Sequence, residues 1–373
     1  MIKEIIYEFD VNQGRARPRQ PELKVEINEL QRKAAFPSDR WWVAGLSWEL
    51  TDKPMARILV NHRIVFFRSA DGRVSALQDR CCHKDLPLSL GTVEERGLRC
   101  GYHGLLYDCS GTCIEVPGQD RVPAKARVPA YAVEERDQIL WIWIGSNPDS
   151  KPTEPPPAYE FHANPAFKFG GGVVHYEAPY QLIHDNLLDL SHLGYVHLHT
   201  IGGNPGVHMN AEMKVDQQGD VVRVIRHMSG SEPPPTYTAA WPFKGRIDRW
   251  QEIEFHMSHL RIWTGGVDAG TEQLSDPQRG GFHMRGFHGV TPETETTSHY
   301  FWTIATNPER DQEEVLKLVV DQTEKTFLED KIIVEAQWEN QRAFGTLPQV
   351  DIHVDVGPNR ARRVVARLTK GAA

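Results

Sequence analysis

The sequence predicts an α+β fold, with a small all-β domain followed by a larger domain that combines antiparallel strands with helices. Short strand-like runs broken by turn residues fill the segment from Trp41 to about Gly145. A proline-rich stretch, residues 147–157, cannot continue a helix or a central strand. Beyond it, strand patterns and two helical stretches follow. We therefore expect domains at 38–147 and 158–373, preceded by an arm, residues 1–37, whose role is unknown.

Individual elements follow from hydrophobic periodicity and turn chemistry. In the small domain we expect strands over residues 56–68, 74–78 and 140–144, with a turn at residues 70–73 between the first two. In the larger domain we expect strands over 251–263 and 299–305, and helices over 180–192 and 309–344.

The composition excludes several classes of function. The 373 residues carry a net charge of −8, so the chain lacks the basic excess of a nucleic-acid-binding protein. No apolar run reaches the roughly 18 residues of a membrane span, and charged residues interrupt the amino terminus, unlike in a signal peptide. Five cysteines are too few for a disulfide scaffold in a chain of this length. We expect a cytoplasmic enzyme that binds neither nucleic acid nor a membrane.

Two short loops contain the residues of a candidate metal centre. Cys81 and His83 form a Cys-x-His loop, and Cys100 and His103 form a Cys-x-x-His loop, with sixteen residues between them. Two thiolates and two imidazoles can hold a tetrahedral zinc ion or a [2Fe–2S] cluster. Zinc sites commonly take two Cys from one loop and two His from another, whereas each loop here supplies one of each. The spacing therefore favours the cluster.

A second polar cluster follows the proline-rich stretch. Asn186, Asp189 and His192 recur three residues apart, so a helix over 180–192 would place them on one face. Flanking leucines indicate that this face is buried and needs partners, and a metal is one such partner. Helical geometry alone does not decide whether His197 or His199 joins His192. If His197 does, the helix must end, bend or widen, and Gly194 would permit this.

Residues 81–91 and 100–104 resemble the cluster loops of Rieske oxygenases, and residues 183–197 resemble the mononuclear iron motif of the vanillate and dicamba O-demethylase types. The resemblance covers nearly the whole chain after residue 37. Its departures in the first loop are Cys82, Lys84 and the pair Asp85-Leu86, none of which removes a ligand. It implies an all-β Rieske [2Fe–2S] domain and a helix-grip (START-like) catalytic domain with an antiparallel sheet.

The same resemblance implies roles for the polar residues. His192 and His197 would bind a mononuclear Fe(II), and Asp330 would complete a two-histidine, one-carboxylate triad. Asp330 also falls on a less polar helical stripe with Val319, Thr323, Ile333 and Gln337, whereas Glu329 pairs with Lys325 one turn away and is expected at the surface. Asp189 would connect His192 to His103 of the partner subunit for electron transfer, and Asn186 would support the site without binding the metal.

These assignments predict the terminal oxygenase of a multicomponent monooxygenase. The chain has no nucleotide-binding motif, so NAD(P)H would act only through a separate reductase, with or without a ferredoxin. The resemblance implies a homotrimer that uses O2 to dealkylate the oxygen or nitrogen of a small aromatic substrate. Ring dihydroxylation is the alternative enzymatic reading. A zinc-stabilised binding module is the non-enzymatic reading.

Substrate recognition is predicted to involve Ile262, Trp263 and His288. In the dicamba demethylase group an Asn grips the substrate carboxylate where Ile262 stands here. Without that polar group an anion would be desolvated at a cost, which favours a neutral aromatic ether or amide, such as a chloroacetanilide. His288 could still donate one hydrogen bond to a carbonyl.

Overall fold

The computed structural model describes residues 7–10, 15–18, 36–307, 312–345 and 347–370. Most of the predicted arm, residues 1–37, lies outside these ranges. Its described strands, β1 (Tyr7–Asp10) and β2 (Arg15–Pro18), pair with each other in an antiparallel hairpin.

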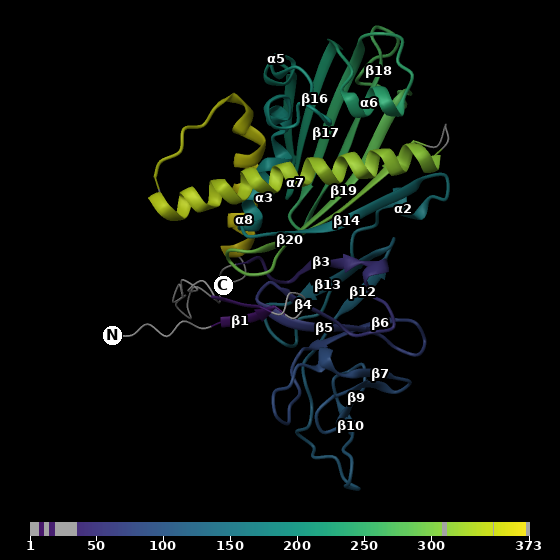
Figure 1. Ribbon diagram of the computed structural model, residues 1–373, viewed down its shortest axis with the longest axis vertical. Coiled ribbons are helices and arrows are strands. Elements are labelled where there is room, and N and C mark those ends of the chain that lie inside the picture. Colours follow the sequence, from purple (N-terminus) through teal and green to yellow (C-terminus); the bar gives the residue numbers. More distant parts are fainter. Residues whose placement is uncertain (1–6, 11–14, 19–35, 308–311, 346, 371–373) are drawn as a thin grey trace.

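The small domain consists of three antiparallel sheets, which lie at one end of the molecule (Figure 1). The sheet that flanks the Cys/His loops has the order β10 (Cys113–Glu115), β9 (Leu106–Tyr107), β8 (Gly97–Arg99), β7 (Thr92–Glu94). The second has the order β11 (Ala130–Tyr131), β6 (Val74–Gln78), β5 (His62–Arg68), β4 (Met55–Leu59). The third has the order β12 (Val133–Arg136), β13 (Ile139–Ile144), β3 (Arg40–Leu46).

The prediction of one strand over residues 56–68 was wrong, because this segment is the hairpin β4–β5. Its turn residues Val60 and Asn61 have φ angles of 51° and 65°, a combination that closes a two-residue hairpin. Valine rarely adopts such a φ. The turn is held from outside, since the Val60 and Asn61 N–H groups donate to the carbonyl oxygens of Pro292 and Glu293 at 2.7 and 3.0 Å.

The larger domain is built on one seven-stranded antiparallel sheet, which confirms the predicted α+β class. Its order is β14 (Lys168–Tyr176), β20 (Ser298–Thr306), β19 (Phe282–Pro292), β18 (His259–Asp268), β17 (Ile247–His256), β16 (Val221–Ser231), β15 (Glu212–Gln218). The helices are α2 (Glu160–Ala163), α3 (Tyr180–Leu188), α4 (Leu193–Val196), α5 (Pro205–Met209), α6 (Pro235–Ala240), α7 (Gln312–Phe344) and α8 (Val356–Lys370). No helix among the described residues is long and apolar enough to span a membrane.

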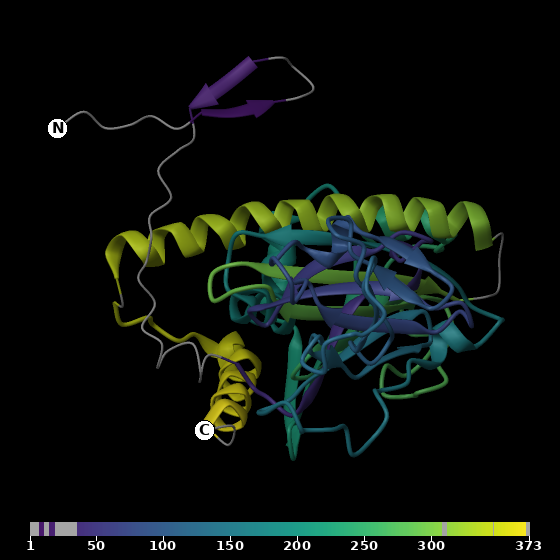
Figure 2. The same cartoon turned by 90° about the horizontal axis from the view of Figure 1, so that it is seen from below.

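The two faces of this sheet have different partners. The long helix α7 runs along one face (Figures 1 and 2). Because successive side chains of a strand point to opposite faces, His288 and its neighbour Phe287 lie on different sides. His288 packs against Phe327 of α7, whereas Phe287 packs against Trp141 of the small domain. The sheet is therefore covered by α7 on one side and by the small domain on the other.

Residues 251–263 form the hairpin β17–β18 rather than the single predicted strand. Met257 and Ser258 make the two-residue connection, which contains neither glycine nor proline. In the observed register Gln251 pairs with Thr264, and Ile253 pairs with Ile262. This pairing determines which side chains of the hairpin face α7.

The predicted helix over residues 180–192 ends early, at Leu188. Asp189 has extended dihedral angles of φ −119° and ψ 92°, and its carboxylate accepts a hydrogen bond of 2.9 Å from the N–H of Ser191. This local bond competes with helix continuation. A 3-10 turn, Leu190–His192, and the short helix α4 follow. Asn186, Asp189 and His192 therefore do not share a helical face, which corrects that step of the sequence argument.

The second predicted helix, over residues 309–344, is present as α7. Its expected first residue, Glu309, lies outside the described residues. The described helix runs from Gln312 to Phe344, 33 residues without a glycine or proline.

Candidate functional site

The two Cys/His loops have equivalent backbone geometry. In each loop the residue four positions after the cysteine donates its N–H to that cysteine's carbonyl, Asp85 to Cys81 at 3.1 Å and Gly104 to Cys100 at 3.2 Å. Both donors have positive φ angles, 59° and 74°. Glycine adopts this conformation freely, and aspartate tolerates it better than most residues. An ion pair of 2.8 Å with Arg80 further holds Asp85, so this departure from the family pattern is structurally accommodated.

The four predicted cluster ligands are arranged as a buried pair and an exposed pair. The Cys81 and Cys100 side chains are buried, whereas His83 and His103 are exposed, with their ring centroids 4.5 Å apart. The hydroxyl of Tyr107 lies 3.2 Å from the Cys81 sulfur. This arrangement fits a [2Fe–2S] group whose thiolate-bound iron lies inside and whose imidazole-bound iron faces outward. All five cysteines are free, including Cys82, Cys109 and Cys113.

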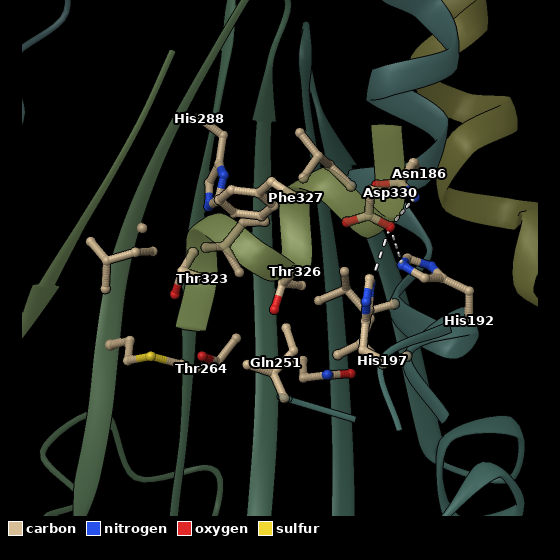
Figure 3. A pocket seen from close by; sticks show the side chains of 18 of the residues that line it. Asn186, His192, His197, Gln251, Thr264, His288, Thr323, Thr326, Phe327 and Asp330 are labelled. Carbon is tan, nitrogen blue, oxygen red and sulfur yellow. Dashed lines mark hydrogen bonds and ion pairs between the residues drawn. The ribbon is translucent and has the colours of Figure 1, made fainter. Parts of the chain in front are cut away.

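Three side chains converge to form the second candidate metal centre. One ligand atom from each of His192, His197 and Asp330 lies within 4.8 Å of the other two. The Nε2 atoms of His192 and His197 are 3.3 and 3.0 Å from the same oxygen, Oδ1 of Asp330 (Figure 3). The three residues come from the 3-10 turn, the end of α4 and α7. The fold thus brings together the three residues predicted to bind iron.

The other ring nitrogen of each histidine has its own acceptor. Nδ1 of His192 lies 2.6 Å from the backbone oxygen of Asp189, and Nδ1 of His197 lies 2.7 Å from Oε2 of Glu329. When a metal is bound at Nε2, the remaining proton of each imidazole lies on Nδ1 and these acceptors hold it, as is common for metal-binding histidines. Glu329, expected at the surface, is only 38% exposed and contacts His197 directly, so that expectation was wrong.

Asp330 is almost completely buried, at 4% exposure. Asn186 donates a hydrogen bond of 3.0 Å from Nδ2 to its Oδ1. Burial alone would raise the pKa of Asp330, but hydrogen bonds from His192 and His197 outweigh it and hold the pKa well below its usual range. Burial also acts to lower the pKa of His197, but its bonds to Asp330 and Glu329 raise it. The site is therefore built to hold a carboxylate in its charged form beside a cation.

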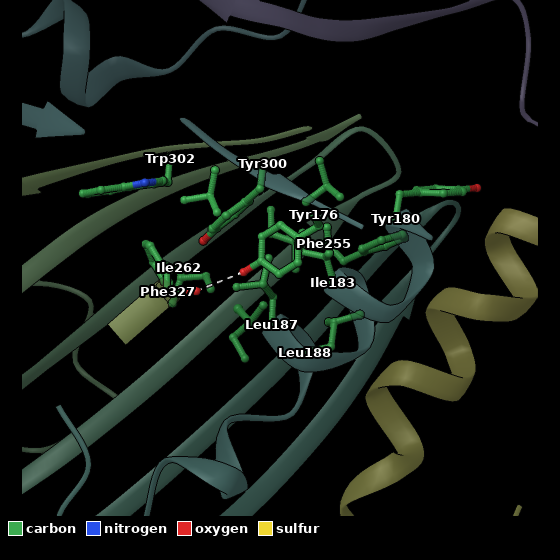
Figure 4. Packing of buried hydrophobic residues seen from close by; sticks show 14 of the residues in the cluster. Tyr176, Tyr180, Ile183, Leu187, Leu188, Phe255, Ile262, Tyr300, Trp302 and Phe327 are labelled. Atoms are coloured by element: carbon green, nitrogen blue, oxygen red, sulfur yellow. Dashed lines mark hydrogen bonds between the residues drawn. The ribbon is translucent and has the colours of Figure 1, made fainter. Parts of the chain in front are cut away.

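The buried face of α7 differs in part from the predicted stripe. Val319 and Thr323 are buried with Asp330 as expected, but Ile333 and Gln337 are exposed. Thr326, Phe327 and Val334 complete the buried face. The Tyr176 hydroxyl donates to the Phe327 carbonyl at 3.2 Å, and these two rings pack with side chains of α3 (Figure 4). This packing fixes α7, and hence Asp330, against α3.

Asp189 contacts His192 differently from the expectation. Its backbone carbonyl, rather than its carboxylate, accepts from the imidazole. The carboxylate caps Ser191 and lies 3.9 Å from Nη1 of Arg226, a guanidinium only 2% exposed. Sequence reasoning missed Arg226, because it lies on a distant strand, β16, with no local motif around it.

A pocket adjoins the three-residue centre. It lies between the sheet and α7, and its lining combines apolar side chains with polar ones (Figure 3). Ile262 and His288, both predicted to contact substrate, line it together with His192, His197 and Asp330. Nδ1 of His288 lies 2.6 Å from the Tyr300 hydroxyl, and burial lowers the pKa of His288 to about 3, so its ring is neutral.

Trp263, the third predicted substrate contact, does not line this pocket. Since Ile262 faces α7, Trp263 faces the opposite side of the sheet. There its indole stacks with the guanidinium groups of Arg285 and Arg279, whose Cζ atoms lie 3.5 and 3.8 Å from the ring centroid. The prediction for Trp263 was wrong, because two adjacent residues of one strand cannot both face the same pocket.

Sequence comparisons match both halves of the chain to known families. A Rieske [2Fe–2S] domain family matches residues 40–131, and the vanillate O-demethylase oxygenase C-terminal domain family matches residues 176–371. A vanillate O-demethylase oxygenase subunit from Pseudomonas sp. strain HR199 is 36% identical over 343 residues, covering 89% of this chain and 95% of the relative. The iron–sulfur subunit of the toluene-4-sulfonate monooxygenase system from Comamonas testosteroni is 34% identical over 341 residues, covering 90% and 97%.

A solved structure has the same overall fold. The crystal structure of dicamba monooxygenase bound to dicamba superposes with a TM-score of 0.81 at 30% sequence identity. The match covers 89% of this chain and 97% of that one. The similarity therefore extends through both domains.

Proposed function

The chain belongs to the vanillate O-demethylase family of Rieske non-haem iron oxygenases, and from this premise we propose that it is the terminal oxygenase of a monooxygenase that dealkylates a substituted aromatic compound. The observation that carries the proposal is one pocket wall that contains His192, His197 and Asp330, beside a cavity whose lining also includes several leucine and isoleucine side chains. Such a cavity binds an aromatic ring next to a metal that retains open positions.

Each chain has two cofactors, a [2Fe–2S] cluster and a mononuclear iron. Cys81, His83, Cys100 and His103 would hold the cluster. His192, His197 and Asp330 would hold the iron. When bound, the cluster supplies electrons and the iron supplies the oxygen chemistry.

The protein's own residues position the reaction. Glu329 and the Asp189 carbonyl orient the two imidazoles, and Asn186 orients Asp330. The apolar wall orients the aromatic ring and excludes water from it. In the net reaction one oxygen atom enters a C–H bond of the alkyl group and the other leaves as water, with two electrons and two protons consumed. The resulting hemiacetal or carbinolamine then releases an aldehyde.

Dealkylation is favoured over ring dihydroxylation by the relatives. Two of those that match over most of the chain are named vanillate O-demethylase and dicamba O-demethylase. A third is named chloroacetanilide N-alkylformylase, which extends the comparison to nitrogen. We propose O- or N-dealkylation for this chain on that basis.

Electrons would reach the iron from a second copy of the chain. The sheet β7–β10, which flanks the cluster loops, lies at one end of the molecule, whereas α3 lies in the other domain, beside α7 (Figure 1). We propose a homotrimer in which His103 of the partner subunit approaches Asp189. A separate ferredoxin or reductase would deliver the electrons from NAD(P)H. We also propose that the two domains span residues 38–147 and 158–373.

A reconstituted turnover assay tests the function. The purified oxygenase, loaded with iron and supplied with a reductase, a ferredoxin and NADH, is expected to release aldehyde from aromatic ethers, anilides or aromatic acids with alkoxy groups. Asp330→Ala should abolish aldehyde release while retaining the visible spectrum of the cluster. A cis-diol product would instead favour ring dihydroxylation. A colourless, zinc-containing protein would contradict both enzymatic readings.

A further inference from the structure

Two buried arginines lie on neighbouring strands of the large sheet. Arg226 on β16 is 2% exposed, and Arg249 on β17 is 3% exposed. Arg226 pairs directly with Gln251, which lines the pocket, and Arg249 is two residues from Gln251 on the same strand. Residues paired across a sheet, and alternate residues of one strand, point to the same face. Both guanidinium groups therefore point to the face that α7 covers.

Ion pairing does not explain why the two guanidinium groups are buried. Within the described part of the chain, the only carboxylate within 4.0 Å of either group is that of Asp189, 3.9 Å from Nη1 of Arg226. Arginine is rarely buried without a partner, and apolar side chains of similar volume are often at least as stabilising as a buried ion pair. The bonds that the two groups donate indicate what they hold in place.

Arg249 holds the turn that follows the second iron histidine, His197. Its Nη1 and Nη2 donate to the backbone oxygens of Gly202 and Ile201 at 2.9 and 2.7 Å. The N–H of Gly202 donates to the backbone oxygen of His197 at 2.9 Å, and the N–H of Thr200 donates to the same oxygen at 3.2 Å. An added Cβ on Gly202 would lie 2.4 Å from that oxygen, so the contact is close. A displacement of this turn would therefore displace His197.

Arg226 has the corresponding place beside the first iron histidine, His192. Its Nη1 lies 3.9 Å from Oδ1 of Asp189, and its Nη2 donates to the backbone oxygen of His208. The backbone oxygen of Asp189 lies 2.6 Å from Nδ1 of His192. Arg226 therefore holds the carboxylate of the residue whose carbonyl orients His192.

The shape of the guanidinium group suits this task. No helix or strand lies between Val196 and Pro205, so the buried carbonyls of this described segment need donors from elsewhere. A guanidinium carries five N–H donors in a rigid, planar fork and can bridge two carbonyls at a fixed separation. The bonds from β16 and β17 thus connect the regular sheet to the irregular segment that supports the two iron histidines.

Resting on the proposed function, in which two histidines bind iron, we propose that Arg226 and Arg249 are positioning residues for that metal. Arg226 acts on His192 through Asp189. Arg249 acts on His197 through the turn that follows it. Groups that orient metal-binding histidines typically change metal affinity about 10- to 100-fold. Because the two arginines act one bond further out, we expect an effect of about tenfold from the removal of either guanidinium.

Iron binding by the full-length variants Arg226→Met and Arg249→Met tests the inference. Methionine is of similar length but has neither the charge nor a donor. Retention of iron is measured against a competing chelator, and the electron paramagnetic resonance spectrum of the nitric oxide adduct of the iron reports the ligand geometry. We expect each variant to lose iron about tenfold faster and to show a changed adduct spectrum. Wild-type retention and spectrum in either variant would overturn the assignment of that arginine.

Arg279→Met is the matched control, because Arg279 is a similarly buried arginine on the opposite face of the sheet. It is 4% exposed, and its Cζ lies 3.8 Å from the centroid of the Trp263 ring. We expect this variant to unfold at a lower temperature without a change in iron retention or in the adduct spectrum. If it loses iron as fast as the two test variants, the loss follows from general destabilisation, and the proposal is wrong.

Lysine variants keep the test decisive if a methionine variant does not fold. Arg226→Lys and Arg249→Lys retain the charge but lack the planar fork. We expect both to fold and to lose iron faster than Arg279→Lys. Iron retention equal to that of Arg279→Lys would contradict the proposal.

The path from Arg226 through Asp189 is tested by combining variants. Effects of residues in one network are not additive, so Arg226→Met should change iron retention less in an Asp189→Asn chain than in the wild type. Two effects that multiply in full would show that Arg226 acts independently of the Asp189 carboxylate, which contradicts this path.

The outcomes separate this inference from the proposed function, because iron binding is measured without substrate or turnover. Arg249 also lines the pocket, so the absence of substrate excludes the loss of a substrate contact as the cause. If the variants lose iron as expected but the wild type releases no aldehyde from any compound, the positioning roles stand and dealkylation fails. If the wild type releases aldehyde and the variants keep iron and its spectrum, dealkylation stands and the positioning roles fail.

Discussion

Two adjacent carboxylates on α7 hold the same imidazole from its two sides. Glu329 Oε2 lies 2.7 Å from Nδ1 of His197, and Asp330 Oδ1 lies 3.0 Å from Nε2. The Glu329 carboxylate is partly exposed to solvent, whereas the Asp330 carboxylate is buried. We infer that Glu329 positions His197 and that Asp330 faces the metal.

Glu329→Gln is expected to weaken iron binding about 10- to 100-fold, because the partner that fixes the imidazole is replaced by an uncharged one. Iron retention against a competing chelator measures the effect, and the cluster's visible spectrum reports whether the fold is intact. Glu335→Gln, which breaks an ion pair with Lys331 on the same helix, serves as the control. Iron retention equal to that of the control would contradict a positioning role.

At the residue scale, sequence motifs pointed to residues that the fold brings together, and sequence reasoning missed partners that are distant in sequence. His192, His197 and Asp330 were identified by motif, and the fold brings them together. Glu329 was assigned to the surface because Lys325 lies one helical turn away, yet its nearest partner is His197.

At the scale of elements, the irregular segment between α3 and α5 sets the separation of the two iron histidines. Gly194 lies between them in sequence, and a Cβ added there would be 2.4 Å from the Pro205 Cα at the start of α5. Gly194 was expected to permit a bend in a helix. Its observed importance is different, because it allows α4 and α5 to approach closely.

Gly194→Ala should therefore force α4 and α5 apart and destabilise the protein by about 1–3 kcal/mol, the usual cost of overpacking. It should also lower iron retention, since His192 and His197 flank the displaced backbone. Thermal unfolding and iron analysis measure the two effects. Gly245→Ala is the matched control, because a Cβ there meets no atom within 4 Å. Equal behaviour of the two variants would show that the contact is not limiting.

Elements were predicted best where they were long and worst where their turns lacked glycine and proline. Helix α7 was anticipated nearly to its end. Both hairpins that were read as single strands turn at residue pairs without glycine or proline, Val60-Asn61 and Met257-Ser258. Independently of the turn, Trp263 could not share the pocket with its neighbour Ile262, because a strand alternates faces at every residue.

At the scale of the whole molecule, the two domains are joined by a polar contact beside an ion pair. The β4–β5 turn of the small domain donates to the backbone of Pro292 and Glu293. The Glu293 carboxylate lies 2.6 Å from Nε2 of His175 at the end of β14. The hydrogen bond from His175 lowers the pKa of Glu293 to about 2, and the bond to Glu293 raises the pKa of His175.

This pair predicts a pH dependence of stability. Glu293 contributes above its ordinary pKa of 4.5 and loses its contribution as the pH falls toward about 2. His175 contributes below its ordinary pKa of 6.5 and loses its contribution as the pH rises through the raised value. Because His175 is 41% exposed, we expect the pair to contribute less than about 1 kcal/mol to the free energy of unfolding. Thermal midpoints of the wild type and Glu293→Gln should differ most between about pH 4.5 and 6.5 and converge above pH 8; a constant difference would contradict this.

Electron transfer between subunits can be tested with mixed assemblies. His103→Ala is expected to lose the cluster and keep the iron residues, whereas Asp330→Ala should keep the cluster and lose the iron. Neither chain contains both centres, so each homo-oligomer should be inactive. If electrons pass between chains, assemblies with both variants should recover aldehyde release, because an intact cluster then adjoins an intact iron site. Introducing Asp189→Asn into the His103→Ala chain should remove this recovery. If mixed assemblies form but stay inactive, the electron path lies within one chain, which would contradict the proposal.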